Sequence, residues 1–235
     1  MTIPTPPRAP CLGDDAYNSH TGYYLGPVAS VAALYVDPAG VYSGIPGVEC
    51  WGEVKDARTY TGPHPVVAHP PCQRWGRFWH GSTRKPHQFR LGDDGGCFSS
   101  ALSSVRRCGG VLEHPADSRA WETFGLAKPK RGAGWIPTSC GGWTCYVEQG
   151  HYGHASRKGT WLMVYGVARE DLPDLEWSRL PQRLDPKMLE RHGYKKARRI
   201  GMVAMVGGKN KTAIRNATPP NFRDILIAIA RKAAS

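Results

Sequence analysis

The feature that most constrains the fold of this chain is an apolar run that stops at two prolines. The run spans residues 65–68, and the sequence His-Pro-Pro-Cys that follows it ends at Cys72. Such a run predicts a buried strand, because prolines cannot continue the hydrogen-bond ladder of a central strand. Open α/β sheets bind ligands at the carboxyl ends of their strands, so we expect Cys72 at the mouth of a site.

Cys72 has the neighbours of a reactive thiol. Arg74 and Arg77 follow it in the sequence, and His69 and His80 are close by. Positive neighbours favour the thiolate, which is the nucleophilic form of cysteine. The alternative is a buried cysteine that packs as a small apolar side chain, which is common in proteins. This segment alone supports both interpretations.

Length and charge indicate a single catalytic domain that binds a polyanion. The chain has 235 residues, and its 31 Lys and Arg against 19 Asp and Glu give a net charge of +12. Nucleic acid is the expected partner rather than a membrane, because the sequence has no run of 18 apolar residues and no signal-peptide pattern. Seven irregularly spaced cysteines favour reduced thiols. We therefore expect a monomer in the cytoplasm, or in the host cytoplasm if the gene belongs to a phage.

Several further segments predict strands and helices in an alternating order. Strands are expected at residues 28–36, 48–51, 111–115 and 160–166, and helices between Asp93 and Gly110 and from Thr218 onward. The last helix has an apolar face that includes Phe222, Leu226 and Ile229. This order predicts an α/β, Rossmann-like fold with a mostly parallel central sheet flanked by helices.

The chain divides into four parts by composition. Residues 1–24 are rich in Pro and polar side chains and predict a flexible arm, and residues 25–165 predict the catalytic domain. Residues 166–212 are broken by prolines and carry a basic run at 191–199, which is typical of a small inserted lobe. Residues 213–235 predict a helix that returns to the catalytic domain.

The segment after the first predicted strand has the order of a nucleoside-cofactor pocket. Gly40, Gly44 and Gly47 lie in a loop between two predicted strands, and Glu53 and Asp56 follow the second strand. Glycines let a backbone approach a ligand, and an acid after the second strand can accept hydrogen bonds from ribose hydroxyls. Plain turns also contain such glycines, so a turn without a ligand is the alternative.

Taken together, the motifs resemble those of the DNA cytosine-C5 methyltransferases, in particular a compact, divergent phage-type branch. The motifs are Pro-Pro-Cys-Gln at 70–73, Leu-Glu-His-Pro at 112–115, an Arg-bearing strand entry at 157, and Arg-Asn-Ala-Thr-Pro-Pro at 215–220. The resemblance covers residues 28–166 and 213–232. Departures occur at residues 34–40, where the family has a glycine-rich motif, and at His114, where the family has Asn.

The resemblance implies a mechanism and a set of site residues. A cysteine adds to C6 of a flipped cytosine, an acid grips the base edge, and S-adenosylmethionine donates the methyl group. The implied catalytic residues are Cys72, Glu113 and Arg157. The implied cofactor-binding residues are Asp37, Gly40, Glu53, Asp56, Pro70 and Asn216. The expected DNA contacts are Arg74, Trp75, Arg77, Lys195, Lys196, Arg198 and Arg199.

Other functions stay open at the level of sequence. The same fold can support a different DNA base modification, or a catalytically silent protein that only binds DNA. A zinc-bearing DNA-binding module is another alternative, with Cys140, Cys145, His151 and His154 as ligands, although their spacing departs from the usual zinc patterns.

Overall fold

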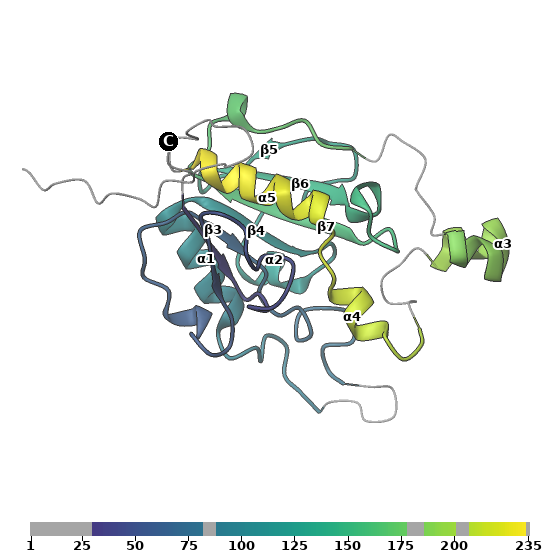
Figure 1. The fold of residues 1–235 in the computed structure, drawn as a ribbon. Coiled ribbons are helices and arrows are strands. Elements are labelled where there is room, and N and C mark those ends of the chain that lie inside the picture. The colour runs from purple at the N-terminus through teal and green to yellow at the C-terminus, as the bar shows by residue number, and fades with distance from the viewer. Residues whose placement is uncertain (1–29, 82–87, 178–185, 201–206, 234–235) are drawn as a thin grey trace, which may run out of the picture.

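A computed structural model describes residues 30–81, 88–177, 186–200 and 207–233. Its centre is a seven-stranded sheet in the order β2-β1-β3-β4-β7-β6-β5, with helices on both faces (Figure 1). The predicted N-terminal arm, residues 1–24, lies outside the described residues. The strands are β1 (Val31–Leu34), β2 (Val48–Trp51), β3 (Val66–Ala68), β4 (Gly110–Pro115), β5 (Ile136–Pro137), β6 (Trp143–Glu148) and β7 (Gly159–Tyr165).

The sheet is mixed, so the prediction of a mostly parallel sheet is wrong in this respect. Strands β2, β1, β3 and β4 pair in parallel, whereas β4 with β7, β7 with β6 and β6 with β5 pair antiparallel. Residues 138–142 connect β5 to β6 and residues 149–158 connect β6 to β7. A parallel crossover needs a dozen or more residues, so connections of this length favour antiparallel pairing.

Helices α1 (Cys97–Cys108) and α5 (Pro220–Lys232) cover opposite faces of the sheet (Figure 1). Both confirm helices that the sequence predicts. The shorter elements are α2 (Arg119–Thr123), α4 (Lys211–Asn216) and the 3-10 helices η1 (Ala57–Thr59), η2 (Gln149–Tyr152) and η3 (Arg169–Asp171).

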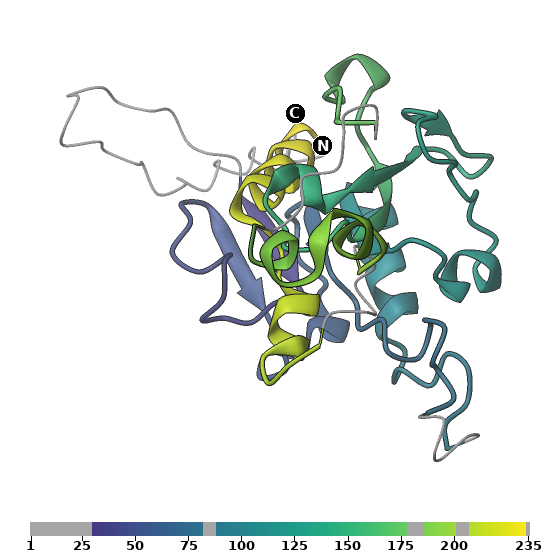
Figure 2. The same ribbon diagram turned by 90° about the vertical axis from the view of Figure 1, so that its right-hand side faces the viewer.

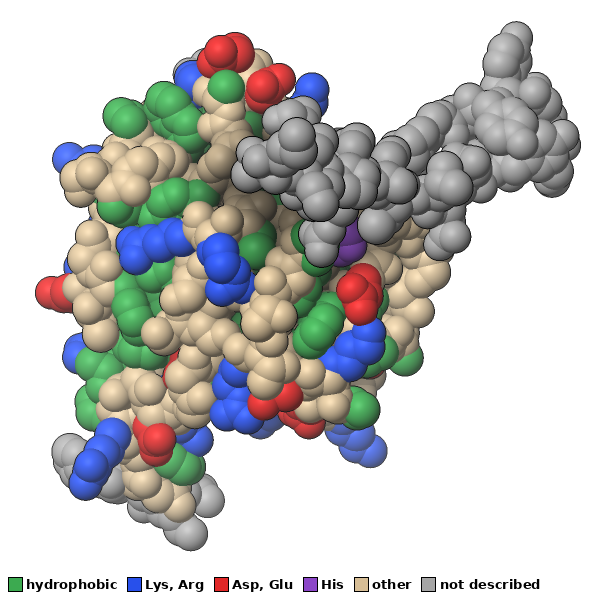
Figure 3. All heavy atoms as spheres, turned by 90° about the vertical axis from the view of Figure 1, so that its left-hand side faces the viewer, with side chains coloured by type: hydrophobic (Ala, Val, Ile, Leu, Met, Phe, Trp, Pro, Cys, Tyr) green, Lys and Arg blue, Asp and Glu red, His purple; other side chains and the backbone are tan. Residues whose placement is uncertain are grey.

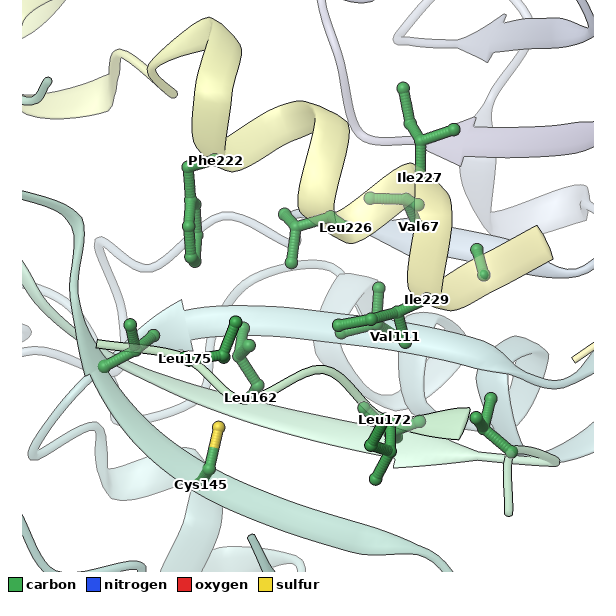
Figure 4. Packing of buried hydrophobic residues seen from close by; sticks show 14 of the residues in the cluster. Val67, Val111, Cys145, Leu162, Leu172, Leu175, Phe222, Leu226, Ile227 and Ile229 are labelled. Atoms are coloured by element: carbon green, nitrogen blue, oxygen red, sulfur yellow. The ribbon is translucent and has the colours of Figure 1, made fainter. Parts of the chain in front are cut away.

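The apolar face of α5 forms one half of the core. Phe222, Leu226 and Ile229 are buried against Val67 of β3 and Val111 of β4 (Figure 4). Burying an aliphatic or aromatic side chain of this size contributes about 1.5–3 kcal/mol relative to leaving it exposed. The helix is therefore fixed on the sheet, and its first turn is fixed beside the carboxyl ends of the parallel strands.

Helix α1 fills the other half of the core with Phe98, Leu102 and Val105. After it, Gly110 begins β4 with a positive φ of 111°. A Cβ at Gly110 would lie 2.0 Å from the Val66 carbonyl oxygen, so the pairing of β3 and β4 requires glycine at this position.

The predicted basic lobe divides into two parts. Leu172, Leu175 and Trp177 join the core under α5, so the beginning of the lobe packs with the central sheet. Helix α3 (Pro186–Ile200), which bends at Gly193, stands apart from the sheet in Figure 1 and lies in front of the sheet in the view of Figure 2. No helix within the described ranges is long and apolar enough to cross a membrane.

Candidate functional site

The candidate site lies at the carboxyl ends of the parallel strands, on the face that α5 covers. Side chains alternate between the two faces of a strand. In β4, Val111 packs under α5 and Leu112 under α1, so Glu113 lies on the α5 face. His114 lies on the opposite face, where its ring packs against aromatic side chains near α1.

Hydrogen bonds hold both oxygens of the Glu113 carboxylate. His69 Nδ1 lies 3.0 Å from Oε2, and Gln149 Nε2 donates to Oε1 at 2.8 Å. His69 follows β3 directly, and Gln149 follows β6. Burial would raise the pKa of Glu113, but the His69 hydrogen bond and the Lys158 charge outweigh it and lower the pKa to about 2. Glu113 is therefore a buried carboxylate that can accept hydrogen bonds from a ligand.

The pKa of the Cys72 thiol depends on the charge of this carboxylate. Burial is the main cause that raises the pKa of the Cys72 thiol, and the negative charge of Glu113 raises it further. The positive charge of Lys158 acts in the opposite direction. Cys72 is thus a protonated thiol at neutral pH, and neutralising Glu113 would make its thiolate easier to form.

Lys158 is the buried cation of the site, although the sequence analysis did not select it. It is 7% exposed, and its Nζ donates to the Ala217 carbonyl oxygen at 2.8 Å. Burial lowers its pKa, while Glu113 and Cys72 raise it. Its backbone has a φ of 38°, in the left-handed region that bulky residues rarely adopt. Strain of this kind is held by surrounding contacts and is frequent at functional sites.

The loop that carries Lys158 is tied to α4. The Ser156 backbone N–H donates to His154 Nδ1 at 2.9 Å, so the hydrogen of the neutral ring is on Nε2. His154 Nε2 then donates to the Ile214 carbonyl oxygen at 2.9 Å. His154 and Lys158 together hold the segment between α4 and α5 beside the site.

Arg157, the predicted basic residue of the catalytic set, lies against a different carboxylate. Its Nε is 3.7 Å from Oε1 of Glu148, whose other partners include Arg131 at 3.0 Å and the Tyr146 hydroxyl at 3.0 Å. In β6, Tyr146 and Glu148 lie on the α1 face because Cys145 and Val147 pack under α5. Arg157 and Lys158 therefore serve different clusters.

The predicted cofactor residues lie at the same edge of the sheet, but two of their acids have partners within their own loops. The Asp37 carboxylate accepts a hydrogen bond from the Ala39 N–H at 2.9 Å, and the Asp56 carboxylate pairs with Arg58 at 2.8 Å. Glu53 is exposed just after β2, where an acid can reach ribose hydroxyls. Of the other predicted residues, Gly40 is half-buried in its turn, Pro70 is buried and Asn216 is exposed at the end of α4.

Trp75 does not lie on the surface as the predicted DNA contact requires. It is 4% exposed, and its indole N–H donates to Asp94 at 2.7 Å. The indole packs against Phe98 and Phe124, which makes it part of the core under α1. An indole with a satisfied N–H and apolar neighbours gains more from the core than from solvent.

The other predicted DNA contacts occupy several places. Arg74 stacks on the Phe89 ring at 3.4 Å, and Arg77 is exposed beside it in the same loop. Lys195 and Lys196 are exposed on α3. The side chains of Arg198 and Arg199 lie outside the described residues.

The four predicted zinc ligands do not come together. Cys145 is buried in the core under α5, whereas Cys140 is exposed and contacts the Tyr165 hydroxyl at 3.0 Å. His151 pairs with Glu148, and His154 binds backbone. No group of three or more His, Cys, Asp or Glu side chains in the described part of the chain is arranged to hold a metal ion.

Sequence reasoning missed Lys158 and Gln149, and one signal was available for the lysine. Every second residue of a strand points to the same face, so Lys158 is expected on the face of Thr160 and Leu162 of β7. Leu162 packs under α5, on the side of Glu113. Arg157 is expected on the opposite face, the face of Trp161, which packs under α1. Gln149 could not be found this way, because it follows a strand that the sequence analysis did not predict.

Comparison of the whole chain with protein-family models, with curated proteins and with solved structures gives no match in any of them.

Proposed function

We propose that this chain is a DNA base-modifying enzyme with a Rossmann-like fold, in which Cys72 forms a covalent adduct with a flipped base. The observation that carries the proposal is the group of half-buried Cys72 with buried Glu113 and Lys158, whose charges act on one another. A nucleophile, a hydrogen-bonding carboxylate and a cation are the groups that addition to a pyrimidine ring needs. The net charge of +12 supports DNA as the partner.

Cytosine is the base that this proposal assigns. The Cys72 thiol releases its proton to solvent, the thiolate sulfur adds to C6, and the ring electrons shift toward N3, which gains a proton beside Glu113. The resulting enamine is nucleophilic at C5. The Glu113 carboxylate can accept hydrogen bonds from the exocyclic amine and from protonated N3, so it stabilises the charge that develops during addition.

Base binding also activates the thiol in this mechanism. The exocyclic amine of the bound base donates a hydrogen bond to Glu113 and partly offsets the negative charge that raises the pKa of Cys72. Lys158 then remains as the uncompensated charge beside sulfur and favours the thiolate. Cys72 thus becomes reactive when the base is in place, which limits side reactions of the resting enzyme.

S-adenosylmethionine is the proposed methyl donor, and when bound it would supply an electrophilic methyl group to C5. Glu53, exposed after β2, would hold its ribose hydroxyls. The local partners of Asp37 and Asp56 favour a second candidate, in which a different electrophile reacts with the same Cys72 adduct.

The test is transfer of label from methyl-tritiated S-adenosylmethionine to duplex DNA, followed by digestion to nucleosides. Cys72→Ala is compared with Cys97→Ala, which replaces a half-buried thiol at the start of α1. We expect label in 5-methylcytosine with the native protein and with Cys97→Ala, and none with Cys72→Ala. Label that persists in Cys72→Ala would contradict the covalent mechanism, and label in another base would contradict the assignment of cytosine.

A further inference from the structure

A continuous line of hydrogen bonds leads from Glu113 to a buried tyrosine. Tyr42 Oη lies 2.7 Å from His69 Nε2, and His69 Nδ1 lies 3.0 Å from Glu113 Oε2. Tyr42 is 2% exposed and belongs to the core cluster under α5. It lies in the loop after β1, so the line joins groups that follow β1 and β3 to one in β4.

The chemistry of these groups fixes the hydrogens of the line. An ionised carboxylate only accepts, so His69 Nδ1 carries a hydrogen. When the only hydrogen of the neutral ring is on Nδ1, His69 Nε2 accepts from the Tyr42 hydroxyl, and when Nε2 carries a hydrogen it donates to the Tyr42 oxygen. A hydroxyl both donates and accepts, so Tyr42 satisfies His69 in both protonation states.

We propose that His69 supplies the proton that Glu113 delivers to the base, with Tyr42 holding the ring in both states. This inference rests on the proposed function, because it concerns the proton that N3 gains during Cys72 addition. The Nδ1–H bond of cationic His69 breaks as an O–H bond forms on Glu113 Oε2, and Glu113 passes a proton to N3. His69 is left neutral with its hydrogen on Nε2, donated to Tyr42, and elimination of Cys72 reverses these transfers.

The resting charge of Glu113 explains why such a donor is needed. Glu113 is ionised at rest, since its pKa is about 2, and an ionised carboxylate has no proton to give. Burial and the Glu113 charge hold the pKa of Tyr42 well above its ordinary value, so Tyr42 stays a hydroxyl. His69 is therefore the member of the line that can hold a transferable proton, because each of its two ring nitrogens can carry a hydrogen.

Other charged groups face this line from several elements. Lys158, at the entry to β7, and Cys72, after β3, act on it through Glu113. Arg223 and Asp224 in the first turns of α5 act on Tyr42 with opposite sign. A pH profile of the native protein alone would combine these groups, so the test compares variants.

The assay is release of tritium from C5 of cytosine in DNA, which needs Cys72 addition and protonation but no methyl donor. Rates at saturating DNA are measured for native protein and His69→Gln from about pH 5 to about pH 9. Gln keeps an N–H donor for Glu113 but cannot carry a proton. We expect His69→Gln to lower kcat on the order of 10²-fold with little change in KM, and to give a pH profile of kcat that differs from the native profile.

Further variants separate a proton donor from a structural residue. Tyr42→Phe should lower kcat less than His69→Gln does, while His64→Gln, before β3, and Tyr194→Phe, exposed on α3, should keep the native profile. If His69→Gln fails to fold, as judged by thermal melting, His69→Asn and Tyr42→Phe provide the comparison. A folded His69 variant with the native kcat and the native pH profile would overturn the inference about His69 but leave the proposed function standing. Native protein without tritium release or methyl transfer overturns the proposed function as well.

Discussion

At the scale of single residues, the reactivity of Cys72 depends on the charges of Glu113 and Lys158. Glu113→Gln removes a negative charge that raises the pKa of Cys72, so alkylation by iodoacetamide near pH 8 should become faster. Lys158→Met removes a positive charge that lowers this pKa, so alkylation should become slower. Each unit of pKa changes the thiolate fraction about tenfold while the thiol is mostly protonated.

Peptide mass spectrometry must follow Cys72 separately, because Cys140 is exposed and also reacts. Cys140 serves as the internal control, since neither substitution lies near it. Equal Cys72 rates in the native protein and both variants would contradict the assigned charges of the site.

His114 gives the fold a dependence on acid pH. Burial lowers the pKa of His114 to about 4, below its ordinary value of 6.5. As the pH falls below about 6.5, His114 binds a proton in the unfolded chain, whereas in the folded chain it binds one only near pH 4. The free energy of unfolding therefore decreases as the pH falls from about 6.5 to about 4. The full difference corresponds to about 3 kcal/mol. Urea unfolding near pH 7 and near pH 4 should show this loss in the native protein and a smaller loss in His114→Phe.

The phenylalanine variant keeps an aromatic ring between Phe98 and Trp121, so the comparison isolates the titrating group. Native protein and His114→Phe with the same loss of unfolding free energy would show that other groups control the acid dependence.

At the scale of elements, the position of a residue within a strand decides which site it serves. Lys158 and Arg157 are adjacent in sequence, yet Lys158 acts on Glu113 and Arg157 pairs with Glu148. We expect Lys158→Met to lower tritium release at saturating DNA on the order of 10²-fold. Arg157→Met should keep kcat within a few-fold of the native value. The opposite order of effects would restore Arg157 to the catalytic set.

The same scale explains how much the sequence could predict. Strands β3 and β4 and helices α1 and α5 were predictable, because each has a buried apolar pattern and a Pro or Gly at one end. Strand β6 was missed because its Cys145 was considered as a zinc ligand, although the Trp, Thr, Tyr and Val of this segment are typical of a strand. Because β6 was not predicted, the antiparallel half of the sheet and the hydrogen bond from Gln149 to Glu113 were not predicted either.

The candidate site shows the same division. Cys72 and Glu113 could be selected because each is a chemical group at the predicted end of a strand. The hydrogen bond from Tyr42 to His69 joins residues of separate loops, and its formation depends on how the loops fold back over the sheet. Burial of Trp75 likewise follows from packing against α1, which periodicity within its own segment does not reveal.

At the scale of the whole molecule, the excess of positive charge predicts salt-dependent binding to DNA. On the face shown in Figure 3, Lys and Arg side chains are spread among apolar and neutral ones rather than gathered in one patch. Arg131 and Arg157 differ from these, because they pair with buried Glu148 next to Gln149 of the site. Their side chains are 53% and 38% exposed, so each has N–H donors for a phosphate.

We therefore expect Arg131→Met to weaken DNA binding more than Lys55→Met, which removes an exposed charge beside β2. The affinity of the native protein for DNA, measured by fluorescence anisotropy, should fall steeply as the salt concentration rises. Each phosphate contact should contribute about −0.9 to the slope of log K against log salt concentration. The slope should decrease by about one for Arg131→Met. Equal slopes for the two variants would exclude a phosphate contact at Arg131.

The measurement that tests the central claim most directly is tritium release from C5 of cytosine in DNA by native protein and by Cys72→Ala. The assay reports covalent addition itself and does not depend on the identity of the methyl donor. We predict release by the native protein and none by Cys72→Ala, with DNA binding retained in both. Native protein that binds DNA but releases no tritium would contradict covalent addition to cytosine by Cys72.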